Sequence, residues 1–325
     1  MSSATELRPV RTRLLLRVLL PGLAVALIAV AVVVLVREEA RPGSACRAAR
    51  EPAPGGSWCS VYREDFTVPV PVGGFTNVPA DDWSLAPANP YASSLRSYPD
   101  GWPTTGDLSL NLASRTAQVA EAADGAQGVF RLDGRTEVVD GRPQALGGSF
   151  YPVTDPGAED VRARTSQLYG RYTVRFRTEG GFAPGPDGAY PSDPAAGRYG
   201  TAFLLWPADD RWADGEVDFP EMGWGDRVQG HVHTVGRPEV TSADVTTATS
   251  SAAWSTATIE WSPGLLVLRL DGAEVFRTTT DVPSVPMRWG FQSGAMGATP
   301  DPGVSGALLV DHVDIDAYAR GTGSS

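Results

Sequence analysis

Three carboxylates fall within six residues in the segment from Glu216 to Glu221, which otherwise reads as a β-strand. Glu216 and Asp218 are two residues apart, so their side chains point to the same face of a strand. Glu221 lies an odd number of residues from both and would point to the opposite face of a regular strand. One bulge residue corrects this parity, and Pro220 stands where a bulge is tolerated. The spacing therefore predicts three acids on one face of a bulged strand.

Acids grouped in this way suit one kind of chemistry in particular. Two carboxyl groups about 5–5.5 Å apart are what retaining hydrolysis of a glycosidic bond needs, one as the nucleophile and the other first as an acid and then as a base. A third acid between them can support the charge of the nucleophile and share a proton with it. Crowded carboxylates raise at least one pKa, so folds rarely keep them without a use. The alternatives are an exposed acidic strand, a calcium site, or a metal site completed by His231 and His233.

The pattern Glu-x-Asp-x-x-Glu on a bulged strand resembles the signature of glycoside hydrolase family 16, the group of laminarinases, lichenases and agarases. Further segments resemble other strands of that family. The resemblance as a whole covers roughly residues 60–319. The segments that carry it are Tyr169–Phe176, Tyr199–Pro207, Val228–His233, Ile259–Gly272 and Val310–Val313.

The resemblance implies a fold, a reaction and three catalytic residues. The fold is an all-β, two-sheet antiparallel sandwich of the jelly-roll, concanavalin A-like type, with a cleft on its concave sheet. The reaction is the retaining, endo-acting hydrolysis of a β-linked polysaccharide, with a β-1,3- or β-1,3/1,4-glucan as the expected substrate. Glu216 is the expected nucleophile, Asp218 the assisting acid and Glu221 the acid/base. No cofactor is required, and a structural calcium ion at Asp311 is the one metal that the resemblance allows.

Two other functions fit the same residues. A cell-wall glucan transglycosylase would use the same acids, with a sugar hydroxyl in place of water in the second step. A non-catalytic carbohydrate-binding sandwich would keep the fold, but it predicts the loss of at least one of the acids, and all three are present.

Residues on both sides of the acids are expected to bind the sugar. Trp206 and Trp212 precede the motif, and indole rings bind the flat C–H faces of sugars. The family usually has a tryptophan where this chain has Leu204, so Trp206 supplies the ring two residues later on the same face. By the same resemblance, His233 lies beside the nucleophile and Gln292 supplies an amide contact to the substrate.

The sequence beyond residue 57 predicts an all-β domain. Short alternating apolar runs are punctuated by turn residues, and the whole chain contains 36 Gly and 27 Pro. A hairpin is expected around Pro263 and Gly264, and a second tight turn at Asp271 and Gly272. Residues 69–107 and 179–198 read as long loops of the kind that shape a binding cleft.

The N-terminus predicts a single membrane anchor. Residues 18–36 form an uncharged apolar run, which would span roughly 28 Å as a helix at about 1.5 Å per residue. Arginines precede the run and place the N-terminus in the cytoplasm, at positions Arg8, Arg11, Arg13 and Arg17. A cleaved signal peptide is the alternative.

The expected organisation is a cytoplasmic tail at 1–17, the membrane span at 18–36, a linker at 37–57 and an extracellular sandwich domain at 58–320. The two cysteines, Cys46 and Cys59, both follow the apolar run. In an exported chain they are expected to form a disulfide, which would contribute about 3 kcal/mol through the entropy of the unfolded chain.

The charge of the chain bears on its partners. The net charge is −11, and all 27 basic residues are arginine, a bias that reflects genome composition. An acidic chain of this kind argues against nucleic acid or anionic lipid as a partner and suits a neutral polysaccharide. The domain is expected to be a monomer.

Overall fold

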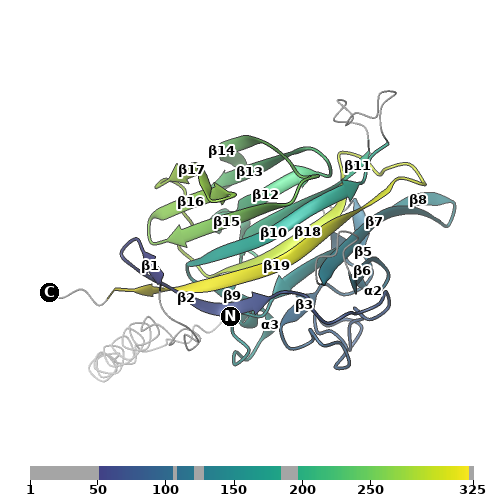
Figure 1. Cartoon of the computed structure of the whole chain (residues 1–325), viewed down its shortest axis with the longest axis horizontal. Helices are drawn as coiled ribbons and strands as arrows, with labels where there is room; N and C mark the ends of the chain where they lie inside the picture. The colour runs from purple at the N-terminus through teal and green to yellow at the C-terminus, as the bar shows by residue number, and fades with distance from the viewer. Residues whose placement is uncertain (1–50, 105–107, 121–127, 184–196, 322–325) are drawn as a thin grey trace, which may run out of the picture. The chain divides into compact units, whose positions relative to one another are not determined.

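Two β-sheets, antiparallel except for one short parallel pair, face each other in the part of the chain that the structure describes (Figure 1). The computed structural model describes residues 51–104, 108–120, 128–183 and 197–321. Sheet 1 runs in the order β17 (Ala273–Thr278), β16 (Leu265–Leu270), β15 (Ser255–Ser262), β10 (Gly170–Gly180) and β19 (Ser305–Arg320). The far edge of β19 pairs with β2 (Gly56–Glu64) and β7 (Val129–Val139), which pair in turn with β1 (Glu51–Ala53) and β6 (Ala117–Ala120).

Sheet 2 carries the acidic motif. Its order is β14 (Arg237–Ser250), β13 (Arg227–Thr234), β12 (Val217–Gly223), β11 (Arg198–Pro207), β18 (Met287–Met296), β8 (Arg142–Pro152) and β3 (Leu95–Ser97). The short strand β9 (Ser166–Gln167) pairs with the start of β18, and β4 (Pro103–Thr104) pairs with β5 (Ser109–Asn111). Helix in the described residues is limited to single turns, α2 (Ala113–Thr116), α3 (Val161–Arg164) and η1 (Trp212–Asp214).

Strand β8 joins the two sheets. Its first half pairs with β7 and β5 in sheet 1, and its second half pairs with β18 and β3 in sheet 2. The transfer takes place at Gly147 and Gly148. A Cβ atom on Gly147 would lie 1.9 Å from the carbonyl oxygen of Ser293, so only glycine allows β8 to approach β18 here.

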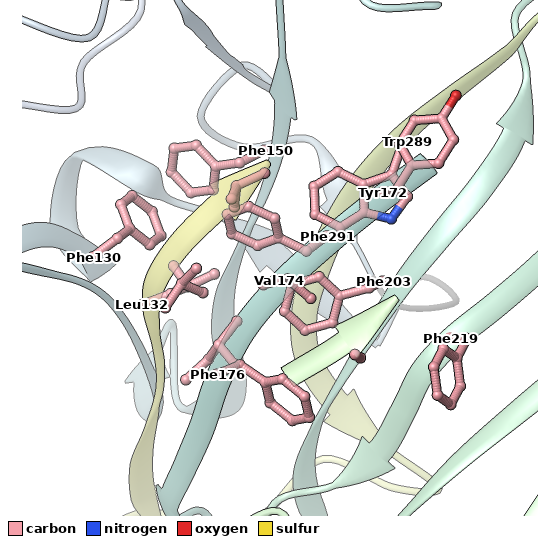
Figure 2. Close-up of a cluster of buried hydrophobic side chains, with 14 of the residues drawn as sticks. Phe130, Leu132, Phe150, Tyr172, Val174, Phe176, Phe203, Phe219, Trp289 and Phe291 are labelled. Atoms are coloured by element: carbon pink, nitrogen blue, oxygen red, sulfur yellow. The ribbon is translucent and has the colours of Figure 1, made fainter. Parts of the chain in front are cut away.

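Alternating side chains from both sheets fill the core between them. On β10, Tyr172, Val174 and Phe176 are buried, whereas the residues between them face outward. Figure 2 shows these three side chains close to aromatic residues of sheet 2, which include Phe203, Trp289 and Phe291. Burying each large apolar side chain contributes about 1.5–3 kcal/mol, so this layer holds the two sheets together. The predicted two-sheet antiparallel sandwich is confirmed.

Both predicted tight turns are confirmed as well. Strands β15 and β16 form a hairpin, with φ of +69° at Gly264. Strands β16 and β17 are joined through Asp271 and Gly272, whose φ angles are +51° and +80°. Two successive residues with positive φ match the twist of the strands they join, which is why Asp-Gly is favoured there.

The N-terminal part of the domain differs from the expectation. Residues 51–57 were expected to belong to the linker, but β1 and the start of β2 pair there as a hairpin at the edge of sheet 1. Strand β1 pairs with β2, which pairs in turn with β19 at the other end of the sequence, and composition alone does not reveal that second pairing.

The predicted span and the predicted disulfide concern the same end of the chain. The span at residues 18–36 lies outside the described residues, and within those residues no helix is long and apolar enough to cross a bilayer. Cys59 is buried in β2 and disulfide-bonded, whereas Cys46, its expected partner, lies outside the described residues.

Candidate active site

A β-bulge in β12 brings the three acids to one face of sheet 2. Against β11, Ala202 pairs with Glu221 and Leu204 pairs with Asp218, so two steps on β11 match three on β12. The register against β13 shifts at the same place. Phe219 and Pro220 are both buried at the shift, while Asp218 and Glu221 on either side of them face the opposite way. The predicted bulge is confirmed.

The acids lie in a cavity of about 730 Å³ on the face of sheet 2 that points away from the core. Its walls combine strand residues with loop residues from the segment between β3 and β5. The side chains that line it include Tyr98, Thr104, Leu204, Trp206, Asp210, Trp212, Glu216, Asp218, Glu221, His233, Arg288, Gln292 and Met296. A cleft of this size that contains converging carboxylates has the character of a ligand site.

Glu216 is held by contacts from two directions. The indole nitrogen of Trp212 donates to its Oε2 at 2.5 Å, and Nε2 of His233 lies 3.8 Å from the same oxygen. Burial raises the pKa of Glu216, and the charge of His233 and the bond from Trp212 act in the opposite direction. A hydrogen bond to Asp218 also lowers the pKa of Glu216. These contacts favour the charged carboxylate that a nucleophile needs.

Asp218 is the most deeply buried of the three acids, with 4% of its surface exposed. Its Oδ2 lies 3.3 Å from Nε2 of His233. Burial raises its pKa well above the usual value, and the charges of Glu216 and Glu221 raise it further, against the bond with His233. Asp218 is therefore suited to hold a proton and share it with Glu216, as the sequence predicts for the assisting acid.

His233 carries positive charge in this cluster. Its Nδ1 lies 2.6 Å from the carbonyl oxygen of Pro238, which can only accept, so this nitrogen must donate. The hydrogen bond with Asp218 raises the pKa of His233 to about 9, against a smaller effect of burial. At neutral pH both ring nitrogens therefore carry a proton, and Nε2 faces Asp218 and Glu216.

Glu221 has a different environment from Glu216. Burial raises its pKa, and His231 and then His233 lower it. Nε2 of His231 lies 3.7 Å from its Oε2, while Nδ1 of His231 lies 2.6 Å from Asp244 on β14. Its pKa is thus raised from the usual value, which is the direction that a general acid requires.

A metal ion would compete with this proton network for the same atoms. One ligand atom from each of Glu216, Asp218 and His233 lies within 4.8 Å of the other two, and in the described part of the chain no other group of at least three such side chains meets this spacing. A histidine must lose its proton to bind a metal, and Asp218 holds His233 in the protonated form.

The other predicted site residues fall into two groups. Trp206, Trp212 and Gln292 all line the cavity, as expected of substrate contacts. Asp311 does not line it and pairs with Arg175 at 2.9 Å on β10 of sheet 1. Calcium binding at Asp311 stays a prediction. Trp224, which also stands close to the motif, is fully buried in the core.

Several residues of the cavity were missed from the sequence. Asp210 and Arg288 form an ion pair within it, and Tyr98 reaches it from a loop more than a hundred residues away in sequence. One signal could have revealed Arg288, because it stands four residues before Gln292 on β18 and so shares its face of the sheet. No local signal marks Tyr98.

The histidines provide a direct test of the proton network. The chain has three, so each resonance can be assigned by substitution. We expect His233 to titrate near pH 9 by NMR, and Asp218→Asn to bring its pKa back toward about 6.5. Because the folded pKa is raised, the stabilisation from this proton is complete below about pH 6.5 and is lost as the pH rises through about 9.

His312 is the internal control for this titration, because it lies on β19 and its Nδ1 is 3.3 Å from Asp311. At a fixed pH, Asp218→Asn should leave the resonances of His312 in place. A His233 that titrates near 6.5 in the unaltered protein would contradict the network.

The chain is similar in fold to several solved structures. The endo-β-1,3-glucanase from Pyrococcus furiosus matches with a TM-score of 0.56 and 13% identity, over 84% of this chain and 100% of that one. The laminarinase from Rhodothermus marinus matches with a TM-score of 0.55 and 19% identity, over 81% and 98% of the two chains. SCLam, a non-specific endo-β-1,3(4)-glucanase from glycoside hydrolase family 16, matches with a TM-score of 0.55 and 16% identity, over 86% of this chain and 98% of that one. By sequence, no family model and no curated protein match. At these identities the likeness establishes the fold, an all-β sandwich that the chain shares with these three enzymes.

Proposed function

We propose that the chain is a retaining, endo-acting glycoside hydrolase that cleaves a β-linked glucan, with β-1,3 or mixed β-1,3/1,4 linkages. The observation that carries the proposal is the bulged strand β12, which brings Glu216, Asp218 and Glu221 to one face in a cavity of about 730 Å³. The different environments of Glu216 and Glu221 match the two roles that retaining hydrolysis requires.

In the first step Glu216 attacks the anomeric carbon while Glu221 gives its proton to the leaving oxygen. The glycosidic bond breaks, and a covalent bond forms between the sugar and Glu216. In the second step Glu221, now a carboxylate, takes a proton from water, and the resulting hydroxyl displaces Glu216. Atoms and charge balance over the two steps, and only carboxyl groups and water take part.

The surrounding residues support these roles. Trp212 and His233 hold the charge of Glu216 before the attack. When Glu216 becomes an ester its negative charge disappears. The charge of Glu221 raises the pKa of Glu216, and a charge interaction of this kind acts equally on both partners. The pKa of Glu221 should therefore fall between the two steps, as its change from acid to base requires.

The names of the similar structures suggest the substrate. They are described as an endo-β-1,3-glucanase, a laminarinase and a non-specific endo-β-1,3(4)-glucanase, which all act on β-glucans. The tryptophans of the cavity suit a neutral sugar chain, since indoles bind its C–H faces. The acids there would repel an anionic polysaccharide.

A panel of polysaccharides tests the proposal. Laminarin, mixed-linkage glucan, agarose and xyloglucan are incubated with the protein, and the products are measured by mass spectrometry, with the first anomer read by NMR. We expect short oligosaccharides from laminarin or mixed-linkage glucan, released first as the β-anomer. Products longer than the starting oligosaccharide would show a transglycosylase. An inverted first anomer would exclude the retaining mechanism. If no substrate is cleaved, the enzymatic role is overturned.

We propose further that residues 18–36 anchor the chain in the membrane with the sandwich domain outside the cell. The proposal rests on the uncharged apolar run and the arginines before it. We expect the full chain to stay with the membrane fraction after a high-salt wash, and protease added to intact cells to digest the domain. A shorter mature form in the medium would show a cleaved signal peptide instead.

A further inference from the structure

Asp210 connects four parts of the molecule at one end of the cavity. Its Oδ1 accepts hydrogen bonds from the indole nitrogen of Trp206, at 3.1 Å, and from Arg288 on β18. Its Oδ2 pairs with Arg162 of α3 at 2.8 Å. Both carboxylate oxygens therefore have partners from separate elements, and the buried Arg288 holds Oδ1 where it accepts from Trp206.

Arg288 makes this arrangement rigid. Its side chain is 3% exposed, and its guanidinium carbon lies 5.5 Å and 5.8 Å from the ring centroids of Trp83 and Tyr151. A buried guanidinium needs a partner charge, and Asp210 supplies it. Asp210 has a φ of +63°, a left-handed conformation that Asp tolerates better than most residues.

The indole of Trp206 is aligned with a second indole as a result. The ring centroids of Trp206 and Trp212 are 6.5 Å apart, and the two planes are within 19° of parallel. Trp212 in turn donates to Glu216 at 2.5 Å. The two indoles therefore pack as a near-parallel pair that is hydrogen-bonded to Glu216 through Trp212 and to Asp210 through Trp206.

We propose that Asp210 is a positioning residue for a neutral sugar chain: it holds the indole of Trp206 parallel to that of Trp212, so that successive sugar units stack on the two rings. This rests on the proposed function and extends it to a residue that touches no reacting atom. A partly exposed indole without a fixed partner samples several rotamers, and ordering it on binding weakens the affinity. Asp210 removes most of that cost before the sugar arrives.

A double-mutant cycle measures the coupling. Binding of laminari-oligosaccharides of two to six units is measured by calorimetry in the full chain with Glu216→Gln, which prevents turnover. We expect Asp210→Ala to weaken binding of the longest oligosaccharides about five- to tenfold and to leave the shortest nearly unchanged. In protein that already carries Trp206→Ala, adding Asp210→Ala should weaken binding by less than about a further twofold, because the effect of Asp210 passes through Trp206.

Asp209→Asn is the matched control. It makes the same change of charge one residue away, and the amide oxygen can still accept from the backbone N–H of Arg211, as the carboxylate does at 3.2 Å. Binding should be unchanged at every length. Equal losses at all lengths, or additive effects in the double variant, would show a merely structural Asp210 and overturn the proposal.

A measurement without sugar tests the same point. In protein labelled with 5-fluorotryptophan, the Trp206 resonance is assigned by its absence in Trp206→Phe. We expect Asp210→Ala to shift and broaden this resonance and Asp209→Asn to leave it in place. An unchanged resonance in Asp210→Ala would overturn the positioning role.

The outcomes separate this inference from the proposed function. If oligosaccharides bind with the expected dependence on length but no polysaccharide is cleaved, the positioning role stands and the hydrolase fails. If cleavage occurs and the mutant cycle is additive, the hydrolase stands and the positioning role fails. If no oligosaccharide binds, the proposal that sugar units stack on Trp206 and Trp212 is overturned.

Discussion

Glu216→Gln should abolish turnover of every glucan that the protein cleaves, by about 10⁴-fold or more. Glutamine keeps the size of the side chain and an oxygen that can accept from Trp212, so the fold should be unchanged. The amide cannot form the covalent bond to the sugar, which is why the loss should be this large. Initial rates on the preferred polysaccharide, with unfolding curves for both proteins, provide the measurement.

Azide gives the role of Glu216 a stereochemical test. In Glu216→Ala the small anion can enter the vacated space and attack an activated aryl glycoside directly, so it should restore release of the aryl group and give the inverted glycosyl azide. Glu260→Gln is the matched control, since Glu260 pairs with Arg269 at 3.2 Å on sheet 1, and it should retain full turnover. Near-normal activity of Glu216→Gln without azide would remove Glu216 from the role of nucleophile.

Glu221→Ala should affect two substrates very differently. Cleavage of polysaccharide should fall by about 10²–10⁴-fold, because the leaving sugar oxygen needs a proton in the transition state. The first step on a dinitrophenyl glycoside should fall less than about tenfold, since that leaving group needs no proton. The second step still lacks its base, so a burst of dinitrophenol should precede slow turnover.

The product formed with azide distinguishes Glu221→Ala from Glu216→Ala. Azide should accelerate the second step of Glu221→Ala and give the glycosyl azide with retained configuration, because it attacks the covalent intermediate. The pH dependence is a further check: burial raises the pKa of Glu221, so activity of the unaltered protein should fall as the pH rises through that pKa. Equal losses on both substrates in Glu221→Ala would remove the acid/base role.

The sequence by itself determined the architecture of the acidic strand. A period of two sets which side chains share a face, and one bulge residue at Pro220 reverses the parity, so the convergence of Glu216, Asp218 and Glu221 needs only local geometry. The core followed from the same rule, since the alternation on β10 assigns Tyr172, Val174 and Phe176 to the interior. Trp206 and Trp212 could also be predicted as cavity residues, because they stand close to the acidic motif in the sequence.

Only the tertiary structure decided what surrounds these residues. The ion pair between Asp210 and Arg288 joins residues 78 positions apart, and Tyr98 comes from a distant loop, so no local pattern could reveal either. The place of the β1–β2 hairpin in the sheet was missed because β2 pairs with β19, which lies at the other end of the chain. The protonation of the acids depends on burial and on the distance to His233, and both arise only when β12 and β13 pair within the folded sheet. Periodicity is a property of neighbouring residues, whereas burial and charge pairing depend on segments that folding brings together.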